Sequence, residues 1–391
     1  METNTPELRV EGRVRSTSAP PVPVRRNGVT RSNPSHARSA CIAGTSTALA
    51  AHHYAQSDLA SLASRFIPHG ALREGTIERF FARVGVQDRY LALPAERYGT
   101  LSGLGARNDA WLEVATELGE SVLRRLLDEA GLDASDIALL ATTTVTGIAV
   151  PSLDARMMNR LPFRSSLKSM PFFGLGCLGG AAGVARVADY LRGAPTEAAI
   201  LLSVELCSLT FQPHDGSMAN IVSTGLFGDG ASAVLLVGAE HPLAGRGLGP
   251  RVVDTRSAFF PNSERVMGWD VTDTGFRVVL SPDVPAIVTK YVPDAIDAFL
   301  APHDLSRSDI DAWVVHPGGP KVIDAIVRSL GLPESALAST RESLRRIGNL
   351  SSSSVLFLLD ERRRTPPRSG GHGILMAMGP AFCAEMVLLS W

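Results

Sequence analysis

The stretch Ser169–Gly193, SMPFFGLGCLGGAAGVARVADYLRG, decides the fold of this chain. Its first part, Met170–Leu175, is an apolar run that predicts a buried strand. A cysteine between glycines follows at Cys177, and small and apolar residues at helical spacing then continue to Gly193, which predicts a helix end. Cys177 should therefore lie at a strand-to-helix turn, at the N-terminal end of the helix.

The position of Cys177 allows two interpretations. Free backbone N–H groups and the dipole at a helix N-terminus favour negative charge. The pKa of a thiol there falls from about 8.5 toward ~4–7, which makes a thiolate nucleophile. The alternative is a small buried cysteine in a tight turn, and the turn alone does not decide between the two.

Length and composition describe an ordinary globular protein with more than one core. The 391 residues suggest two domains or two halves, and 45 % hydrophobic with 20 % charged residues is a typical composition. A net charge of −1 gives no electrostatic reason to expect nucleic acid or an anionic membrane as a partner. No apolar stretch approaches the length of a membrane span, so we expect no integral membrane segment.

The four cysteines are scattered along the chain without CxxC spacing. This pattern argues against a zinc site and against a disulfide scaffold, and it predicts no bound metal. A reduced, cytoplasmic setting is the default expectation for such a chain. The N-terminus also lacks the charged-then-apolar order of a signal peptide.

Composition divides the chain into three parts. Residues 1–39 are rich in Pro, Ser, Thr and Arg without periodicity, which predicts a disordered tail. An N-terminal half, residues 40–245, carries Cys177. A C-terminal half, residues 246–391, follows a Gly- and Pro-rich connection and carries His316 and Asn349.

An internal duplication is visible in the two halves. Leu132-Asp-Ala-Ser-Asp-Ile137 and Leu305-Ser-Arg-Ser-Asp-Ile310 each precede a predicted buried strand, at an offset of 173 residues (305 − 132). Cys177 and Asn349, each leading into a predicted helix, are offset by 172 residues (349 − 177). Two related βα halves would place Cys177 and Asn349 at equivalent helix starts, with His316 at a strand end facing them. Alternating strands and helices predict a layered α/β architecture.

These three side chains have complementary chemistry. A thiolate attacks an acyl thioester and holds the acyl group, and a nearby histidine stabilises the thiolate. His316 and Asn349 together offer two donors to an oxygen where negative charge develops, as decarboxylation of a malonyl thioester to an enolate requires. No metal or redox cofactor is needed. Alternatively, His316 is a structural histidine, and Asn349 is equally suited to be a helix N-cap.

At these residues the sequence resembles the type III polyketide synthases, the chalcone synthase-like enzymes of the thiolase superfamily, from about Ile42 to Trp391. Five motifs carry the resemblance, in the order GLGCLGGAAG, LFGDGA, WVVHPGGP, RIGNLSSSSVLFLLDE and MGPAF. The resemblance implies a thiolase-like fold with two related halves in αβαβα layers, and a homodimer that uses acyl-CoA and malonyl-CoA. It also implies that Cys177 carries the acyl group, while His316 and Asn349 activate the thioesters.

The resemblance implies substrate contacts as well. Phe227 matches the family's gatekeeper aromatic between the CoA tunnel and the acyl cavity, and Val150 matches a position that reaches across the dimer. The other expected substrate-binding residues are Cys207, Thr210, Thr146, Trp269, Val278, Gly379 and Pro380. Arg73, Arg79 and Arg83 are expected to bind CoA at a basic mouth, although an exposed helix face explains these arginines equally well.

The runs TTTVTGIAVPSLDAR and VELCSLTF are similar to bacterial members, some of which make alkylpyrones or alkylresorcinols from fatty acyl starters. This similarity predicts repeated Claisen condensations on Cys177, from a fatty acyl starter, and cyclisation to a pyrone or a phenol or resorcinol. Cys207 would open a side tunnel for the alkyl chain, whereas Trp269 would shrink the main cavity. The alternatives are a single-round ketoacyl synthase III-like enzyme and a non-catalytic partner subunit with the same fold.

Overall fold

The computed structural model describes residues 39–68 and 75–391. Apart from Ser39, the predicted N-terminal tail lies outside the described residues, and so does Arg73.

The N-terminal half contains β1 (Cys41–Leu49), β2 (His52–Ala55), α1 (Gln56–Phe66), α2 (Thr76–Arg83), β3 (Asp88–Leu91), α3 (Gly103–Ala130), β4 (Ile137–Thr144), α4 (Leu153–Met157), β5 (Lys168–Phe173), α5 (Gly179–Gly193), β6 (Ala198–Leu206), α6 (Met218–Leu226) and β7 (Asp229–Val237). The C-terminal half contains β8 (Arg251–Phe259), β9 (Met267–Thr272), β10 (Gly275–Leu280), α7 (Val284–Leu300), β11 (Ile310–Val315), α8 (Pro320–Leu330), α9 (Ala338–Ile347), α10 (Ser354–Arg364), β12 (His372–Gly379) and β13 (Cys383–Ser390).

Strand order reveals two equivalent sets of strands. Hydrogen bonding connects nine strands in the order β11-β12-β13-β8-β1-β7-β6-β4-β5. Reading outward from the centre, β1-β7-β6-β4 mirrors β8-β13-β12-β11, and the two sets meet where Cys41 pairs with Arg251. β5, at the end of the sheet, belongs to the N-terminal set alone.

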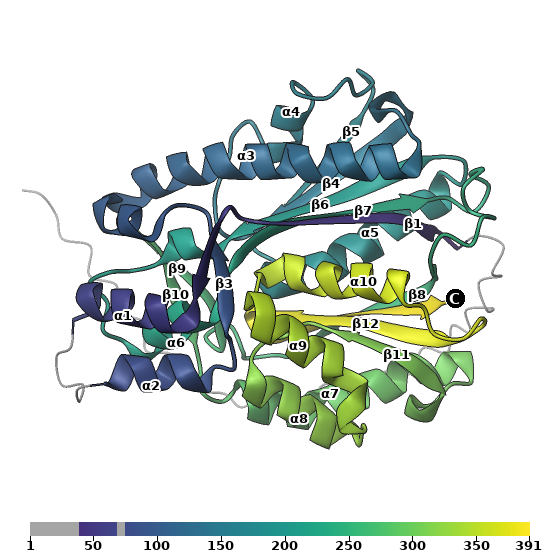
Figure 1. Cartoon of the computed structure of the whole chain (residues 1–391). Coiled ribbons are helices and arrows are strands. Elements are labelled where there is room, and N and C mark those ends of the chain that lie inside the picture. The colour runs from purple at the N-terminus through teal and green to yellow at the C-terminus, as the bar shows by residue number, and fades with distance from the viewer. Residues whose placement is uncertain (1–38, 69–74) are drawn as a thin grey trace, which may run out of the picture. The chain divides into compact units, whose positions relative to one another are not determined.

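Helices lie on both faces of each set of strands (Figure 1). α3 covers the outer face of the N-terminal strands, α7 and α8 cover the C-terminal ones, and α5 and α10 lie between the two sets. The side chains of β6 show why helices cover both faces, because successive side chains point to opposite faces and apolar ones lie on both. Ala199 and Leu201 pack in the central core, whereas Ile200 and Leu202 pack toward α3. Strands buried on both faces read as continuous apolar runs. The predicted thiolase-like α/β fold in five layers is therefore confirmed.

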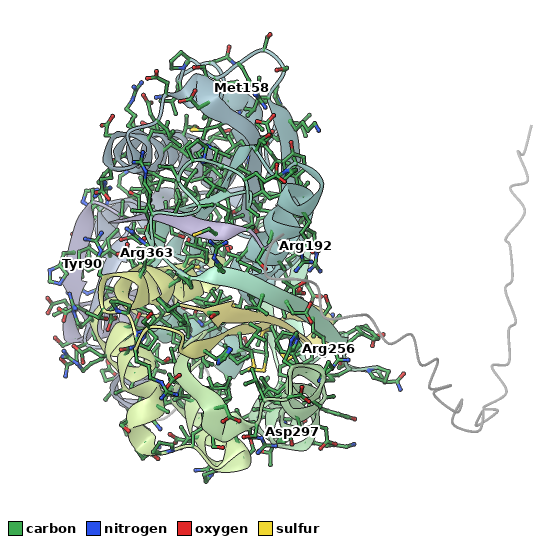
Figure 2. All side chains as sticks on the ribbon, turned by 90° about the vertical axis from the view of Figure 1, so that its right-hand side faces the viewer. Tyr90, Met158, Arg192, Arg256, Asp297 and Arg363 are labelled. Atoms are coloured by element: carbon green, nitrogen blue, oxygen red, sulfur yellow. The ribbon has the colours of Figure 1, made fainter. Side chains whose placement is uncertain are left out.

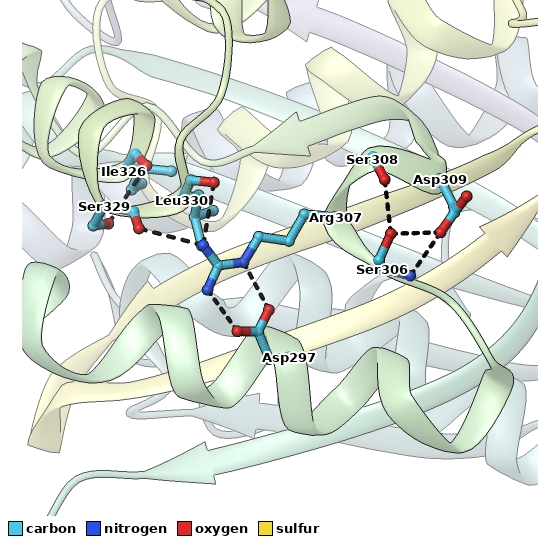
Figure 3. Close-up of polar contacts among 8 residues, drawn as sticks. All are labelled: Asp297, Ser306, Arg307, Ser308, Asp309, Ile326, Ser329 and Leu330. Carbon is cyan, nitrogen blue, oxygen red and sulfur yellow. Dashed lines mark hydrogen bonds and ion pairs between the residues drawn. The ribbon is translucent and has the colours of Figure 1, made fainter.

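The duplicated hexapeptides have the same local structure. Each forms a short 3₁₀ turn with a reciprocal capping box, in which Asp133 pairs with Asp136 and Ser306 pairs with Asp309. Figure 3 shows the second box, which stands directly before β11 as the first stands before β4.

Interlocking side chains join the halves. In Figure 2 they fill the space between the layers, and Arg363 of α10 reaches the N-terminal strand β1. Its Nε donates to the Thr45 hydroxyl at 2.7 Å, and that hydroxyl donates to the Asp360 carboxylate at 2.6 Å. Within residues 39–68 and 75–391, no helix has both the length and the apolar character that crossing a bilayer requires.

Two expectations from the sequence were wrong in part. The run Met170–Leu175 overlaps strand β5, which ends at Phe173, but this strand lies at the end of the sheet, where Phe173 is 55 % exposed instead of buried. Pro171 suits such an edge because a proline has no N–H to donate to a second neighbour. Apolar residues at helical spacing in the segment Asn108–Gly131 predict a helix that Gly131 ends; this helix, α3, begins earlier, at Gly103, and ends as predicted before Gly131, whose φ is 65°.

Candidate active site

The fold brings the three predicted catalytic residues to one cavity. Cys177 lies in the 3₁₀ turn before α5, His316 follows β11, and Asn349 precedes the turn that leads into α10. All three line one space, here named the Cys177 cavity. They are 7 %, 2 % and 1 % exposed, respectively.

Two glycines allow the chain to pack around Cys177. Gly176 has a φ of 52°, and a Cβ there would lie 2.6 Å from Cδ of Pro380. A Cβ on Gly379 would lie 2.6 Å from the carbonyl oxygen of Leu175. Pro380 lines the Cys177 cavity as expected, whereas the evident role of Gly379 is close packing behind the cysteine.

The thiol of Cys177 is protonated in this closed cavity. It donates to the Ser351 hydroxyl across 3.7 Å, and burial raises the pKa of Cys177 to about 12. The predicted lowering of this pKa is therefore wrong. A helix terminus stabilises a charge by about 0.3–2 kcal/mol, and the desolvation of a buried thiolate outweighs that.

His316 and Asn349 present hydrogen-bonding groups to the same cavity. Burial lowers the pKa of His316 to about 3, and neither ring nitrogen has a partner among the described residues. The imidazole is therefore neutral, with one donor and one acceptor. Asn349 accepts a hydrogen bond at Oδ1 from the Ser351 N–H at 2.8 Å, which fixes the direction of its carboxamide.

A buried glutamate behind the site was not predicted. Glu205 accepts hydrogen bonds from the Ser352 hydroxyl at 2.5 Å, the Thr146 hydroxyl at 3.0 Å and the Val145 N–H at 3.1 Å. Burial raises its pKa to about 7. Thr146, expected to contact substrate, serves this network instead and is not in the cavity wall formed by the described residues. The available signal was the only charged residue inside a strand, 198–206, that is apolar apart from Ser203.

A second space, here named the side cavity, adjoins the Cys177 cavity. The two share the wall residues Cys207, Phe227, Trp269 and Val278, all expected to contact substrate. The side cavity continues past Thr210 to apolar side chains of α1. The Cys177 cavity measures about 60 Å³ and the side cavity about 70 Å³.

A third space, here named the outer cavity, has a much larger volume of about 590 Å³. It shares Leu226 and Met267 with the Cys177 cavity, and its wall contains Arg83 and Lys321. Of the arginines expected to bind CoA, Arg83 thus lines this space, and Lys321 beside it was not predicted although lysines are rare in this sequence. Arg79 donates to the Thr76 hydroxyl at 2.8 Å on α2.

Sequence comparisons identify the family. The profile for the N-terminal domain of chalcone and stilbene synthases matches residues 37–241, and that for the C-terminal domain matches residues 251–390. The chain belongs to this family. Its members include type III polyketide synthases, which are acyltransferases, and this chain is an enzyme of that class.

Individual relatives agree with this assignment. The chain is 47 % identical to a 1,3,6,8-tetrahydroxynaphthalene synthase of Streptomyces peucetius subsp. caesius, over 90 % of this chain and 94 % of the relative. It is 35 % identical to a putative chalcone synthase of Bacillus subtilis, over 90 % and 99 %. It is 31 % identical to a phloroglucinol synthase of Pseudomonas fluorescens, over 82 % and 90 %.

Solved structures give the same result. The tetrahydroxynaphthalene synthase of Streptomyces coelicolor superposes with a TM-score of 0.83 at 30 % identity, covering 90 % of this chain and 99 % of that one. PKS-I of the brown alga Ectocarpus siliculosus superposes with a TM-score of 0.84 at 26 % identity, covering 90 % and 98 %.

Proposed function

We propose that this enzyme loads an acyl group on Cys177, decarboxylates malonyl-CoA, extends the acyl group by repeated condensation and cyclises the product. The supporting observation is that a thiol, a neutral imidazole and an oriented carboxamide line one buried cavity. The proposed reaction uses no metal or further cofactor. The family match favours this iterative enzyme over a single-round ketoacyl synthase and over a non-catalytic subunit.

Loading begins with the neutral thiol and imidazole. As the sulfur of Cys177 attacks the acyl-CoA carbonyl, the thiol proton passes to His316. The tetrahedral intermediate collapses, CoA leaves, and His316 returns the proton to the departing CoA sulfur. Starting from neutral groups avoids holding a separated charge in a dry cavity before substrate arrives.

Decarboxylation of malonyl-CoA follows on the acyl-enzyme. Loss of CO₂ leaves an electron pair that becomes an enolate, whose negative charge develops on the thioester oxygen. The N–H of neutral His316 and the amide of Asn349 stabilise that oxygen, and such preorganised donors are strongest where water is excluded. The enolate carbon then attacks the Cys177 thioester, Cys177 leaves as a thiolate, and the chain, now two carbons longer, is a CoA thioester. For the next extension the Cys177 thiolate attacks this new thioester, which returns the chain to Cys177 and releases CoA as its thiolate.

The outer cavity suits a CoA thioester. Its volume and the wall residues that it shares with the Cys177 cavity fit a tunnel for the pantetheine arm of CoA. The cations Arg83 and Lys321 in its wall fit the phosphate groups at the mouth of such a tunnel. Lys321 is therefore added to the proposed CoA-binding residues. Arg79 remains a candidate as a neighbour on α2.

The volume at Cys177 favours a short starter, for which malonyl-CoA itself is the simplest choice. At about 60 Å³ this space is roughly a tenth of the outer cavity, which measures about 590 Å³. Trp269 stands in the wall beyond which a longer group would have to extend. Together with the 47 % identity to a tetrahydroxynaphthalene synthase, this volume favours a small polyhydroxylated aromatic product.

A fatty acyl starter is the second candidate. The observation that favours it is the side cavity, whose far wall consists of Leu59, Leu62, Ala63 and Phe66 of α1. A rotation of the Trp269 side chain would join this apolar space to Cys177. An alkyl chain would then lie beyond Cys207 while the ketide units grow in the Cys177 cavity.

Mass spectrometry of products distinguishes these possibilities. The purified enzyme is incubated with ¹³C-malonyl-CoA alone, and then with acyl-CoA starters from acetyl to palmitoyl. A small product labelled at every ketide unit supports the short starter, whereas products that retain the added acyl chain support the fatty starter. Release after a single condensation would contradict iterative extension, and absence of CO₂ release would contradict the proposed function.

We further infer a homodimer formed at the N-terminal edge of the sheet. Val150 is 91 % exposed, Phe173 55 % and Ile148 43 %, and exposed apolar side chains gathered at one edge favour an interface. Light scattering should give twice the chain mass for the wild-type protein. Val150→Asp should raise the monomer fraction, and a monomeric wild type would contradict the inference.

A further inference from the structure

A buried arginine holds the backbone on which both Phe227 and Asn349 depend. Arg89, in β3, is 4 % exposed. A single nitrogen, Nη1, donates to the carbonyl of Phe227 at 3.0 Å and to the carbonyl of Thr224, at the C-terminal end of α6. A guanidinium in this position satisfies acceptors at a helix end that would otherwise be buried and unpaired.

The same arginine also contacts the turn that carries Asn349. A Cβ on Gly348 would lie 3.4 Å from Cγ and Cδ of Arg89, so the aliphatic part of Arg89 packs against that glycine. The Phe227 and Asn349 segments are themselves paired. The Asn349 N–H donates to the Leu226 carbonyl at 2.9 Å, and the Gly228 N–H donates to the Asn349 carbonyl at 2.9 Å.

The charge of Arg89 is supported inside the protein. Its guanidinium lies over the ring of Phe81, 5.6 Å from the centroid, and the fully buried Asp229 attracts it. Asp229 is fixed in turn by the N–H groups of Ala92 at 2.6 Å and Ser208 at 2.8 Å. Phe81, Arg89 and Asp229 come from separate parts of the N-terminal half, so Arg89 is held from several sides.

We propose that Arg89 is a positioning residue that sets the Phe227 side chain and the Asn349 carboxamide together. The proposal rests on the proposed function. Arg89 does not act on the reacting atoms, because it contacts the backbones of these segments from behind. Its effect on the reaction passes through Asn349, which faces the developing enolate, and through Phe227, which separates the Cys177 cavity from the side cavity.

Arg89→Met tests the proposal, because methionine keeps an apolar stem of similar shape and cannot donate a hydrogen bond. Misplacing a donor by about 1 Å costs about 10²-fold, so we expect kcat for malonyl-CoA decarboxylation to fall by that factor while KM changes less than about 3-fold. The fraction of prematurely released, shorter products should rise. Arg89→Lys should recover at least about 10-fold of the lost kcat, since one nitrogen serves both carbonyls.

Arg307 provides a matched control (Figure 3). Its Nη1 donates to the carbonyls of Ser329 at 3.4 Å and Leu330 at 3.2 Å, at the C-terminal end of α8, and its guanidinium pairs with Asp297 at 2.7 Å. It therefore makes the same kind of contact away from the catalytic residues. Arg307→Met should lower the melting temperature and leave kcat and the product profile unchanged.

The possible outcomes separate clearly. A kcat and product profile for Arg89→Met equal to wild type would overturn the proposal. The proposal would also be overturned if kcat fell in proportion to the melting temperature, by the same factor in the Arg89 and the Arg307 variants. If Arg89→Met does not fold, Arg89→Gln takes its place, because its shorter side chain cannot reach both carbonyls, and an Arg89→Gln variant with unchanged kcat and products would overturn the proposal. If wild type and Arg307→Met both fail to decarboxylate malonyl-CoA, the proposed function itself fails.

Discussion

The N-terminal and C-terminal halves share a scaffold and differ in what they place on it. Both run from a central strand to a long helix, a capping box and a buried strand, and both send a helix into the middle layer. At the start of that helix one half has Cys177, and the other has Asn349 before its 3₁₀ turn. The reacting groups therefore come from equivalent positions, whereas their chemistry differs.

The segments without counterparts build the walls. Between its first strand and its long helix, the N-terminal half inserts β2, α1, α2 and β3, which supply Arg83, Arg89 and one side of the side cavity. The C-terminal half instead inserts the β9–β10 hairpin, which supplies Trp269 and Val278. The duplicated scaffold thus holds the chemistry, and the unmatched insertions shape the space around it.

The largest expected effect comes from the loss of Cys177, and it tests whether the two equivalent helix starts differ in their chemical role. Cys177→Ala removes the proposed acyl-carrying thiol from the cavity that His316 and Asn349 also line, so product formation should fall at least about 10⁴-fold. Product assays and mass spectrometry of the acyl-enzyme measure this. Cys383→Ala, in the C-terminal half, is the control and should retain activity. Condensation that persists in Cys177→Ala would refute the assignment.

The second-largest expected effect concerns Asn349, the counterpart of Cys177 in the C-terminal half. Asn349→Ala removes one donor from the developing enolate, so kcat for malonyl-CoA decarboxylation should fall about 10²–10³-fold. Acyl loading of Cys177 from a starter CoA should change far less, because attack by the thiol precedes enolate formation. Equal losses in loading and decarboxylation would show that Asn349 acts only as a helix cap.

Buried glutamates also differ between the halves. Glu205 has a raised folded pKa of about 7 against an ordinary 4.5, so the folded state binds its proton more tightly than the unfolded state. Its contribution to stability is fully present below pH 4.5 and is lost as pH rises through 7. The free energy of unfolding should therefore fall by about 3 kcal/mol from this group over that range.

Urea denaturation at pH 5 and pH 8 measures this dependence. Glu205→Gln should remove it. Glu385→Gln is the control from the C-terminal half, because Glu385 forms an ion pair with Arg186 at 2.5 Å in addition to accepting a hydrogen bond from the Ser257 hydroxyl at 2.8 Å. A wild-type protein that gains stability between these pH values through Glu205 would contradict the expectation.

The smallest expected effect concerns Trp269, which lies in the inserted β9–β10 hairpin. Trp269→Ala should open the wall between the Cys177 cavity and the side cavity. The ratio of kcat/KM for octanoyl-CoA over acetyl-CoA as starter should then rise about 10-fold, equivalent to roughly 1.4 kcal/mol of transition-state binding. Competition assays with both starters measure the ratio. Val271→Ala, on the same hairpin but 63 % exposed, should leave it unchanged.

The duplicated scaffold was predictable from the sequence, and its catalytic residues with it. The positions of β4 and β11 follow from the related hexapeptides that precede them, and the two offsets pair Cys177 with Asn349. Identical local signals at a fixed offset are robust because they depend on neighbouring residues alone.

Features that depend on distant residues were not predictable. The apolar run at β5 does not reveal whether a second strand covers it, so its exposure was missed. The pKa of Cys177 depends on how dry the cavity is, which no local motif encodes. Glu205 and Arg89 acquire their partners only when segments far apart in sequence meet.

The β9–β10 hairpin has a consequence for how this enzyme diversifies. It forms a two-stranded sheet of its own, held at its tip by Gln212, which donates to the carbonyls of Thr274 and Phe276 at 3.5 and 3.4 Å. Phe227, in contrast, shares backbone hydrogen bonds with the segment that carries Asn349. Inherited changes at Trp269 or Val278 can therefore alter which product is made while the catalytic residues stay in place, so new products should arise first in the hairpin.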